Sequence, residues 1–308
     1  MDKRVATYDG SQILAIIFLL FFFQLIPYGY IFSIFCLLII SKQIILRMIF
    51  LGPPNSRPTL NDPRWEKIIV ENDGFKIVTH QNWVKGNAPL VLFIHGWQSG
   101  SSRFENRMSL FMERGCHTII FDLRSHGETE NTPEWTAGKI ISDVKAIMST
   151  LDQDKITSVS MYGHSLGGFV CIGLHNKKHD GWWMNNFGTL ILESPMVAYS
   201  PVFLESISMI SFMEPILKRW ALNGFNKIHQ DSLSWDDIDF PQWGFPKCPT
   251  LLLQAANDNR LGRFHWDLLN SSEMNLNSHL LETLSHSVNE IHTERDDLII
   301  EWINNNIN

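Results

Sequence analysis

The stretch that decides the fold is SMYGHSLGG, residues 160–168. Ser165 stands between Gly163 and Gly167, at the end of an apolar run that is typical of a buried strand. A strand that turns sharply into a helix at this serine forces its backbone into strained angles, and glycines on either side avoid clashes. The hydroxyl would then stand clear of the sheet, beside the Leu166 N–H at the start of the helix. Because the pattern is short, the surrounding chain must decide between a nucleophile and an ordinary loop serine.

Strand-like and helix-like stretches alternate on both sides of this turn. A first hairpin is expected around Asn72-Asp73-Gly74. Helices are predicted near 103–114, 136–150 and 166–178, and short apolar runs predict buried strands at 90–94, 117–122, 156–162, 188–193 and 250–255. This alternation predicts an α/β fold with a mostly parallel central sheet and helices on both faces. The chemistry of such folds gathers at the carboxyl ends of the strands.

One long insertion, at about 195–245, separates two of the predicted strands. It is rich in aromatic side chains and methionine, and it is predicted to form a mostly helical cap over the strand ends. Core packing explains many of these side chains. The surplus fits two roles that the sequence does not separate, a lining for an apolar substrate and contact with a bilayer.

From about Trp65 onward, some four fifths of the chain, the sequence resembles α/β-hydrolases of the lipase, esterase, monoacylglycerol-lipase and serine aminopeptidase branch. The resemblance departs from the family pattern at Ser125 and Ala255, where glycine is usual. The matching motifs stand in the expected order: LFIHGW (92–97), FDLRSHGET (121–129), YGHSLGG (162–168), LLLQAANDNR (251–260) and LSHSV (284–288). The resemblance implies an α/β-hydrolase fold and serine hydrolase chemistry.

A serine hydroxyl becomes an effective nucleophile only when a base takes its proton and a carboxylate orients that base. The resemblance implies Ser165 as nucleophile, His286 as base and Asp258 as acid, in the chain order that this fold requires. Glu193, which ends the preceding predicted strand, remains the alternative acid.

The Leu166 N–H is expected to stabilise the oxyanion that forms during acyl transfer, and the resemblance places a second N–H donor at Trp97. The expected reaction is acyl transfer to water through an acyl-serine, from carboxylic esters or thioesters that are lipid-derived. Neither a metal nor an organic cofactor is implied, and His175 and His179, spaced i, i+4, lack a nearby third ligand. An acyltransferase, a peptidase or amidase on the same triad, and a catalytically silent binding protein remain alternatives.

The charge of the chain is distributed unevenly. Residues 1–67 contain seven Lys/Arg and four Asp/Glu, a net charge of +3, so the total of −7 leaves −10 for residues 68–308. An acidic body argues against nucleic acid as a partner. The four cysteines are far apart in sequence and are expected to be buried free thiols rather than metal ligands.

The first fifty residues predict a membrane segment. Residues 13–40 contain no charged side chain and, as one helix, would be about 42 Å long, more than the roughly 30 Å hydrocarbon core. Pro27-Tyr28-Gly29 leaves two alternatives open, one kinked span or a hairpin with two short limbs. The predicted organisation is an anchor at 1–51, a proline-rich linker at 52–64 and a hydrolase domain at 65–308.

Basic residues near the ends of the apolar run predict its orientation. Lys3 and Arg4 precede it, whereas five basic residues follow it by residue 67. The positive excess on the C-terminal side predicts a cytoplasmic catalytic domain. The expected partners are therefore a lipid bilayer and a small acyl ester. We expect the anchor to hold the enzyme at the membrane without building its active site.

Overall fold

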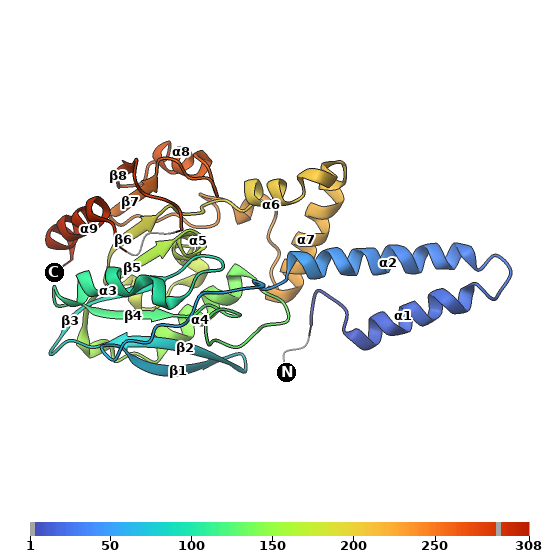
Figure 1. The fold of residues 1–308 in the computed structure, drawn as a ribbon, viewed down its shortest axis with the longest axis horizontal. Helices are drawn as coiled ribbons and strands as arrows, with labels where there is room; N and C mark the ends of the chain where they lie inside the picture. The colour runs from blue at the N-terminus through green and yellow to red at the C-terminus, as the bar shows by residue number, and fades with distance from the viewer. Residues whose placement is uncertain (1–3, 288–290, 308) are drawn as a thin grey trace.

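The structure is a computed structural model that describes residues 4–287 and 291–307. Its centre is a single eight-stranded sheet in the order β1-β2-β4-β3-β5-β6-β7-β8 (Figure 1). The strands are β1 (Glu66–Asn72), β2 (Phe75–Asn82), β3 (Ala88–Ile94), β4 (His117–Phe121), β5 (Ile156–His164), β6 (Phe187–Glu193), β7 (Thr250–Ala255) and β8 (Leu276–Leu281). β1 and β2 pair antiparallel around the predicted hairpin, β2 pairs antiparallel with β4, and the pairs from β4 to β8 are parallel.

Helices cover both faces of the sheet, which confirms the predicted fold class. On one face α3 and α9 pack on β3, β4 and β5, and on the other face α4, α5 and α8 bury the second apolar layer. The helices are α1 (Gly10–Phe23), α2 (Tyr30–Ile49), α3 (Glu105–Met112), α4 (Ala137–Ser149), α5 (Leu166–Leu174), α6 (Ser200–Ser206), α7 (Glu214–His229), α8 (Phe264–Asn270) and α9 (Thr293–Asn306). Short 3₁₀ turns connect them at Ser101–Phe104, Gln153–Lys155, Lys177–His179, Trp182–Met184, Ser208–Met213 and Asp236–Ile238.

The turn after β4 explains why a glycine is usual at position 125. Ser125 has a φ of 64°, in the left-handed region that glycine adopts without strain. Two hydrogen bonds hold the serine there: its N–H donates to the Glu130 carbonyl at 3.1 Å, and its Oγ accepts from the Thr132 N–H at 3.1 Å. The hydroxyl thus compensates locally for the strain that its own Cβ introduces.

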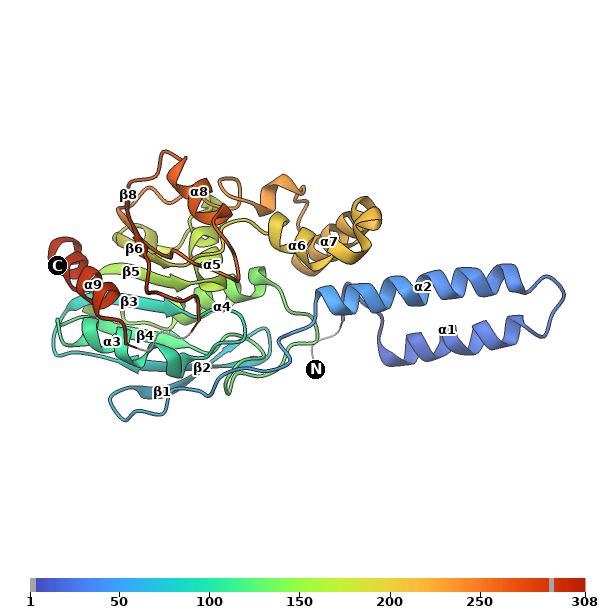
Figure 2. The same cartoon turned by 45° about the horizontal axis from the view of Figure 1, so that its top comes forward.

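The insertion between β6 and β7 forms the predicted helical cap. It contains α6 and α7, which lie over the carboxyl ends of the strands at the side of the molecule that faces α2 (Figures 1 and 2). Its apolar interior is built around Phe203, Ile207, Leu217 and Ala221. Two side chains of the 3₁₀ turn before α7 remain outside this interior, since Met209 is 96% and Phe212 is 83% exposed.

The N-terminal apolar run is a helical hairpin. The chain breaks at Gln24–Gly29, and α1 and α2 lie side by side and project away from the sheet (Figures 1 and 2). Gly29 permits this turn, because a Cβ there would lie 1.7 Å from the Phe23 carbonyl oxygen. By length and composition, α2 is long and apolar enough to cross a membrane, whereas α1 is shorter. Lys3, which belongs to the predicted basic flank, lies outside the described residues.

The start of the hairpin is bound to the sheet domain through a buried carboxylate. Glu134 accepts hydrogen bonds from the backbone N–H groups of Val5, Ala6 and Thr7, at 2.9, 3.1 and 2.8 Å, and from the Thr7 hydroxyl at 2.7 Å. The chain therefore leaves the body of the protein at a fixed point before it enters α1.

The end of the hairpin is held by the cap. Leu46 and Phe50 are buried against Trp220 and Phe225 of α7, and Ile49 joins the same contact. Our expectation that the anchor does not build the active site is wrong, because this packing places residues 48–51 in the wall of the cavity that contains Ser165. The packing occurs because the end of α2 is amphipathic and its apolar face is buried against α7.

The proline-rich stretch at 52–64 lies on the sheet domain. The Arg57 N–H donates to the Ser99 carbonyl at 3.1 Å, and the Leu60 N–H donates to the Ser101 hydroxyl at 2.8 Å. The Leu60 side chain is buried in the core below. The stretch is thus ordered by backbone contacts that its polar composition alone does not predict.

A buried ion cluster joins both central strands to the helices of one face. The Glu193 carboxylate, at the end of β6, accepts two hydrogen bonds of 2.7 Å from Arg107 of α3 and one from the hydroxyl of Tyr162 of β5. Arg295 of α9 lies 3.5 Å away. Burial alone would raise the pKa of Glu193, but the charges of Arg107 and Arg295 outweigh it and lower the pKa below its ordinary 4.5.

We predict that Glu193→Gln lowers the free energy of unfolding by about 3–5 kcal/mol at pH 7, because it leaves the buried guanidinium of Arg107 without its carboxylate partner. Urea unfolding measures the change, with the exposed Glu273→Gln as the matched control. The lowered pKa means that the carboxylate stabilises the fold fully above pH 4.5 and less as the pH falls below it. The difference between wild type and variant should therefore shrink near pH 3; an equal difference at both pH values would contradict the assignment.

Candidate active site

The turn from β5 into α5 has the strained geometry that the glycine spacing predicts. Ser165 has a φ of 53° and a ψ of −118° and directly precedes α5. A Cβ on Gly167 would lie 1.9 Å from the Ile94 carbonyl oxygen, and one on Gly163 would lie 2.7 Å from the Gly167 carbonyl oxygen. Only glycine fits at these two positions, so the sequence pattern is a direct consequence of the close packing between β3, β5 and α5.

The structure brings Ser165, His286 and Asp258 together from three different loops. The Ser165 Oγ lies 2.9 Å from the His286 Nε2, and the His286 Nδ1 lies 2.8 Å from an oxygen of Asp258. Since a carboxylate accepts only, the Nδ1–H donates to Asp258. In the neutral imidazole Nε2 is then free to accept the proton of the serine hydroxyl, which is the tautomer that a general base needs.

Asp258 is held in place by its own loop. One carboxylate oxygen accepts from the N–H groups of Arg260 and Leu261, at 2.8 and 2.9 Å, and the other accepts from Gln254 at 3.0 Å as well as from His286. Burial alone would raise the pKa of Asp258, but these hydrogen bonds lower it to about 2. The carboxylate is therefore ionised at any neutral pH.

Glu193, the alternative acid, is committed elsewhere. Its carboxylate is bound by Arg107 and Tyr162 inside the ion cluster, whereas the imidazole of His286 donates to Asp258. Glu193 ends β6 and Asp258 lies in the loop after the adjacent strand β7, and of these two carboxylates only that of Asp258 contacts His286.

The two N–H groups expected at the oxyanion position come from separate loops. Leu166 is the first residue of α5, and Trp97 follows β3 in the loop beside it. Across the described parts of the chain, neither N–H donates to another protein group, which leaves both available for a ligand. A Cβ on Gly96 would lie 3.0 Å from the Ser165 Cβ, so the loop that carries Trp97 passes close to the serine.

Two buried histidines hold that loop in position and take no part in the proposed proton transfer. The Nε2 of His95 accepts from the Leu123 N–H and the Nε2 of His126 accepts from the Gln98 N–H, each at 3.1 Å. Burial lowers the pKa of both, that of His126 to about 3. They act as neutral acceptors that join the turn after β4 to the loop after β3.

His164, the residue before the serine, has a positioning role that the sequence did not indicate. Its Nε2 lies 2.6 Å from the backbone carbonyl of His286, so the ring nitrogen donates. Burial lowers the pKa of His164 to about 4, which keeps the ring neutral. A neutral ring can make this bond without placing a second charge beside the His286 imidazole, 5.2 Å away.

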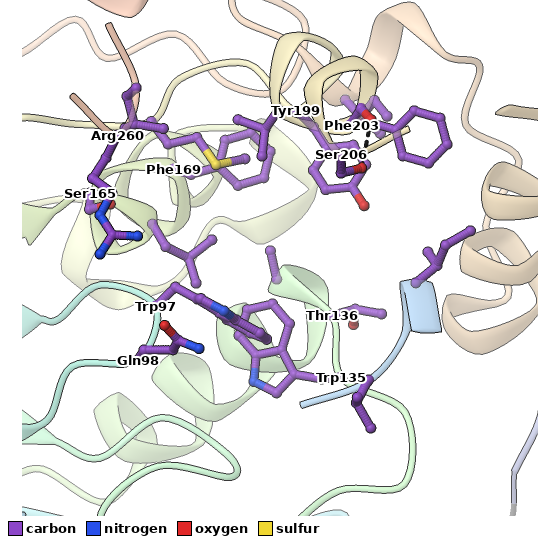
Figure 3. Close-up of a pocket in the computed structure, with 18 of the residues that line it drawn as sticks. Trp97, Gln98, Trp135, Thr136, Ser165, Phe169, Tyr199, Phe203, Ser206 and Arg260 are labelled. Carbon is purple, nitrogen blue, oxygen red and sulfur yellow. Dashed lines mark hydrogen bonds between the residues drawn. The ribbon is translucent and has the colours of Figure 1, made fainter. Parts of the chain in front are cut away.

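Ser165 opens into a cavity of about 640 Å³ between the sheet and the cap (Figure 3). This volume falls within the roughly 300–1,000 Å³ that small-molecule sites occupy. Aromatic and aliphatic side chains of the cap and of α5 line most of it, among them Phe169, Tyr199, Phe203, Phe225, Trp235 and Trp243.

Two groups of lining residues escaped the sequence analysis. Residues 48–51, from the end of α2 and the chain just beyond it, form part of the wall, although the hairpin was expected to lie outside the site. Arg57, Arg103 and Arg260 also line the cavity. Arg260 stands two residues after Asp258, which is a signal that could have placed it at the site; the other two arginines show no pattern in the sequence.

Comparisons with known proteins identify the family to which the chain belongs. The family model described as serine aminopeptidase S33 matches residues 86–239. The α/β-hydrolase superfamily protein YisY of Bacillus subtilis is 30% identical over 206 residues, which cover 56% of this chain and 75% of that protein. The lysophosphatidylserine lipase ABHD12 of Danio rerio is 29% identical over 211 residues, which cover 65% of this chain and 52% of that protein. The chain spans only a fifth of another relative, an uncharacterised abhydrolase domain-containing protein of Dictyostelium discoideum.

Solved structures share the fold at low sequence identity. The esterase Pf2001 of Pyrococcus furiosus superimposes with a TM-score of 0.58 and 17% identity, covering 83% of this chain and 99% of that one. The esterase Est1E of Butyrivibrio proteoclasticus gives a TM-score of 0.57 and 16% identity, covering 77% and 98% of the two chains. The chain therefore belongs to the α/β-hydrolase superfamily, and within it to the serine aminopeptidase S33 family of hydrolases.

Proposed function

We propose that this protein is a membrane-anchored serine hydrolase that cleaves carboxylic esters or thioesters with an apolar acyl chain. The observation that carries the proposal is the hydrogen-bonded chain from Asp258 through His286 to Ser165, which ends in a cavity with a largely apolar wall. Esterases among the solved structures and a lipase among the relatives support the same reaction class.

In the proposed mechanism, His286 Nε2 takes the hydroxyl proton of Ser165 while Oγ attacks the ester carbonyl carbon. The carbonyl oxygen becomes an oxyanion that accepts hydrogen bonds from the N–H groups of Trp97 and Leu166. His286 then donates the proton to the leaving alcohol or thiol, and an acyl-serine remains. Water, deprotonated by the same imidazole, releases the acid and restores Ser165. Asp258 stabilises the imidazolium in both halves of the cycle.

An aminopeptidase activity, which the family description suggests, has less support at this site. Recognition of a free α-amino group calls for a carboxylate in the cavity. The described residues that line the cavity include Arg57 and Arg260, neither of which pairs with a described carboxylate, and no aspartate or glutamate. This charge would repel a protonated amine, so an ester substrate fits the cavity better than a peptide with a free N-terminus.

The α1–α2 hairpin is the proposed membrane anchor. Most of its large apolar side chains are exposed, including Leu14, Phe18, Phe21, Leu25, Phe32, Phe35 and Leu38. Exposure of this much apolar surface is typical of contact with lipid. A hairpin returns the chain to the side from which it entered, and the basic residues after α2 favour the cytoplasmic side for the catalytic domain. Because residues 48–51 join the hairpin to the cavity wall, an acyl chain could pass from the bilayer to Ser165 along one apolar path.

We predict that Ser165→Ala lowers kcat for p-nitrophenyl esters by about 10⁴-fold or more. The substitution removes the nucleophile, and the other two residues of a catalytic triad contribute little without it. The variant should also lose labelling by a fluorophosphonate probe while its thermal unfolding stays unchanged. Ser158→Ala, in the same strand, is the matched control and should label normally. Wild-type turnover by the Ser165→Ala variant would exclude Ser165 from the mechanism, and an unlabelled wild type would favour a silent binding protein.

We predict that Asp258→Asn lowers kcat by about 10³-fold or more with little change in stability, because the amide no longer fixes the imidazole in the active tautomer. Glu193→Gln should instead reduce the amount of folded protein more than the specific activity of the folded fraction. Ester hydrolysis normalised to active protein separates the two effects, and Asp267→Asn, exposed on α8, serves as the control. If the Asp258 variant kept its activity while the Glu193 variant lost it, the acid would be Glu193.

We predict that the full chain stays with membranes after a carbonate wash. The double substitution Phe18→Asp and Phe35→Asp should release it, since each aspartate at the centre of a buried helix costs about 2.5–3.5 kcal/mol. The released protein should still hydrolyse a soluble ester. Phe264→Asp, at an exposed position on the sheet domain, is the matched control and should remain in the pellet. A wild-type chain in the supernatant would refute the anchor.

A further inference from the structure

The cavity carries a charge opposite to that of the domain around it. Residues 68–308 have a net charge of −10, and acidic side chains outnumber basic ones there by 28 to 18. The described lining residues nevertheless include Arg57 and Arg260, which form no ion pair with a described acidic side chain, and no carboxylate. Such a concentration of guanidinium groups in an acidic protein points to a ligand with negative charge.

Arg260 belongs to a loop that flanks Ser165, and Arg57 lies in the stretch that packs on the other flanking loop. Arg260 follows Asp258 in the loop after β7, and the hydrogen bond from its N–H to Asp258 fixes its backbone. In Figure 3, Arg260 and Ser165 lie on one side of the cavity. Arg57 is tied to the other loop, after β3, through its N–H bond to the Ser99 carbonyl.

The side chains of Arg57 and Arg260 are available for a ligand. Both residues are exposed at the cavity rim, and neither forms an ion pair with an acidic side chain in the part of the protein that is described. A guanidinium group offers several N–H donors in a planar fork that matches a phosphate or a carboxylate.

The far part of the cavity is apolar. Tyr199, Phe203 and Ser206 of the cap lie across from Ser165 in Figure 3, and Leu222 and Phe225 of α7 also line the wall. Residues 48–51 complete it at the base of the hairpin. An acyl chain placed along this wall would leave the ester at Ser165 and direct the leaving group towards the arginines.

We infer that the substrate is an anionic amphiphile: an acyl ester whose leaving alcohol carries a phosphate or carboxylate that Arg57 and Arg260 bind. This inference rests on the proposed function and specifies its substrate class. Ser165 Oγ forms the bond to the acyl carbon, the bond from that carbon to the alcohol oxygen breaks, and the alcohol leaves with the proton from His286. Its anionic group stays on the alcohol and takes no part in bond breaking.

The test uses the full chain in detergent micelles and two esters with the same palmitoyl chain, 1-palmitoylglycerol and 1-palmitoylglycerol 3-phosphate. We expect the phosphate ester to have a kcat/KM on the order of tenfold higher, mainly through a lower KM, because charge-assisted hydrogen bonds are the strong ones. Arg57→Ala and Arg260→Ala should each remove most of this preference, and Arg260→Lys should keep part of it. Arg263→Ala, exposed and outside the cavity lining, is the matched control.

Two further measurements separate this inference from the proposed function. Binding of both esters to Ser165→Ala protein reports recognition without turnover, and equal affinity for the two would overturn the inference even if hydrolysis proceeds. Tighter binding of the phosphate ester without hydrolysis by the wild type would support recognition of the anionic group by the arginines, but it would refute the hydrolase and with it the role of the ester as substrate. Hexadecyl phosphate should inhibit competitively, whereas inorganic phosphate at the same concentration should not. Equal inhibition by inorganic phosphate would show a simple anion site and contradict the amphiphile.

Discussion

The positive φ of Ser165 is the constraint on which the rest of the site depends. A serine in this conformation costs of order 1–3 kcal/mol, and the surrounding structure must supply that energy. It does so through three backbone hydrogen bonds: the Ser165 N–H donates to the Glu193 carbonyl at 3.1 Å, and its carbonyl accepts from Gly168 and Met196 at 2.9 and 3.0 Å. These bonds link β5, β6, α5 and the first residues of the cap at one point. The positions of the serine hydroxyl, the oxyanion donors and the cavity wall therefore all depend on the backbone of Ser165.

Two carboxylates at the ends of neighbouring strands show how environment assigns different roles to the same chemical group. Glu193 is surrounded by two guanidinium groups and a phenol, and its charge is used entirely in holding helices to the sheet. Asp258 accepts from backbone N–H groups of its own loop and retains one oxygen for His286. Both pKa values are lowered, but only the second carboxylate is placed where it can support a change of charge on an imidazole.

Sequence patterns predicted the parts of the molecule that local rules govern. Apolar runs separated by helix-like stretches predicted the parallel strands, and the glycines around Ser165 predicted the turn because close packing admits no other residue there. The resemblance named Asp258 and His286, and the structure brings both side chains into one hydrogen-bonded chain with Ser165. What it missed are contacts between distant segments without periodicity, such as Glu134 with Val5, 129 residues apart, and residues 48–51 with the cavity. Such tertiary contacts depend on how the folded helices and strands pack against one another. A local sequence pattern contains no information about that packing.

The attachment of the hairpin at both of its ends has a topological consequence. Backbone groups at residues 5–7 are fixed by Glu134, and the last turns of α2 are fixed by α7. Although the hairpin precedes the domain in sequence, it is therefore equivalent to an insertion between two fixed points. Residues added to one arm must be matched by the other for the helices to stay paired, whereas matched additions leave the domain unaltered. The two arms of the hairpin can thus change length only together if the catalytic geometry is to stay the same.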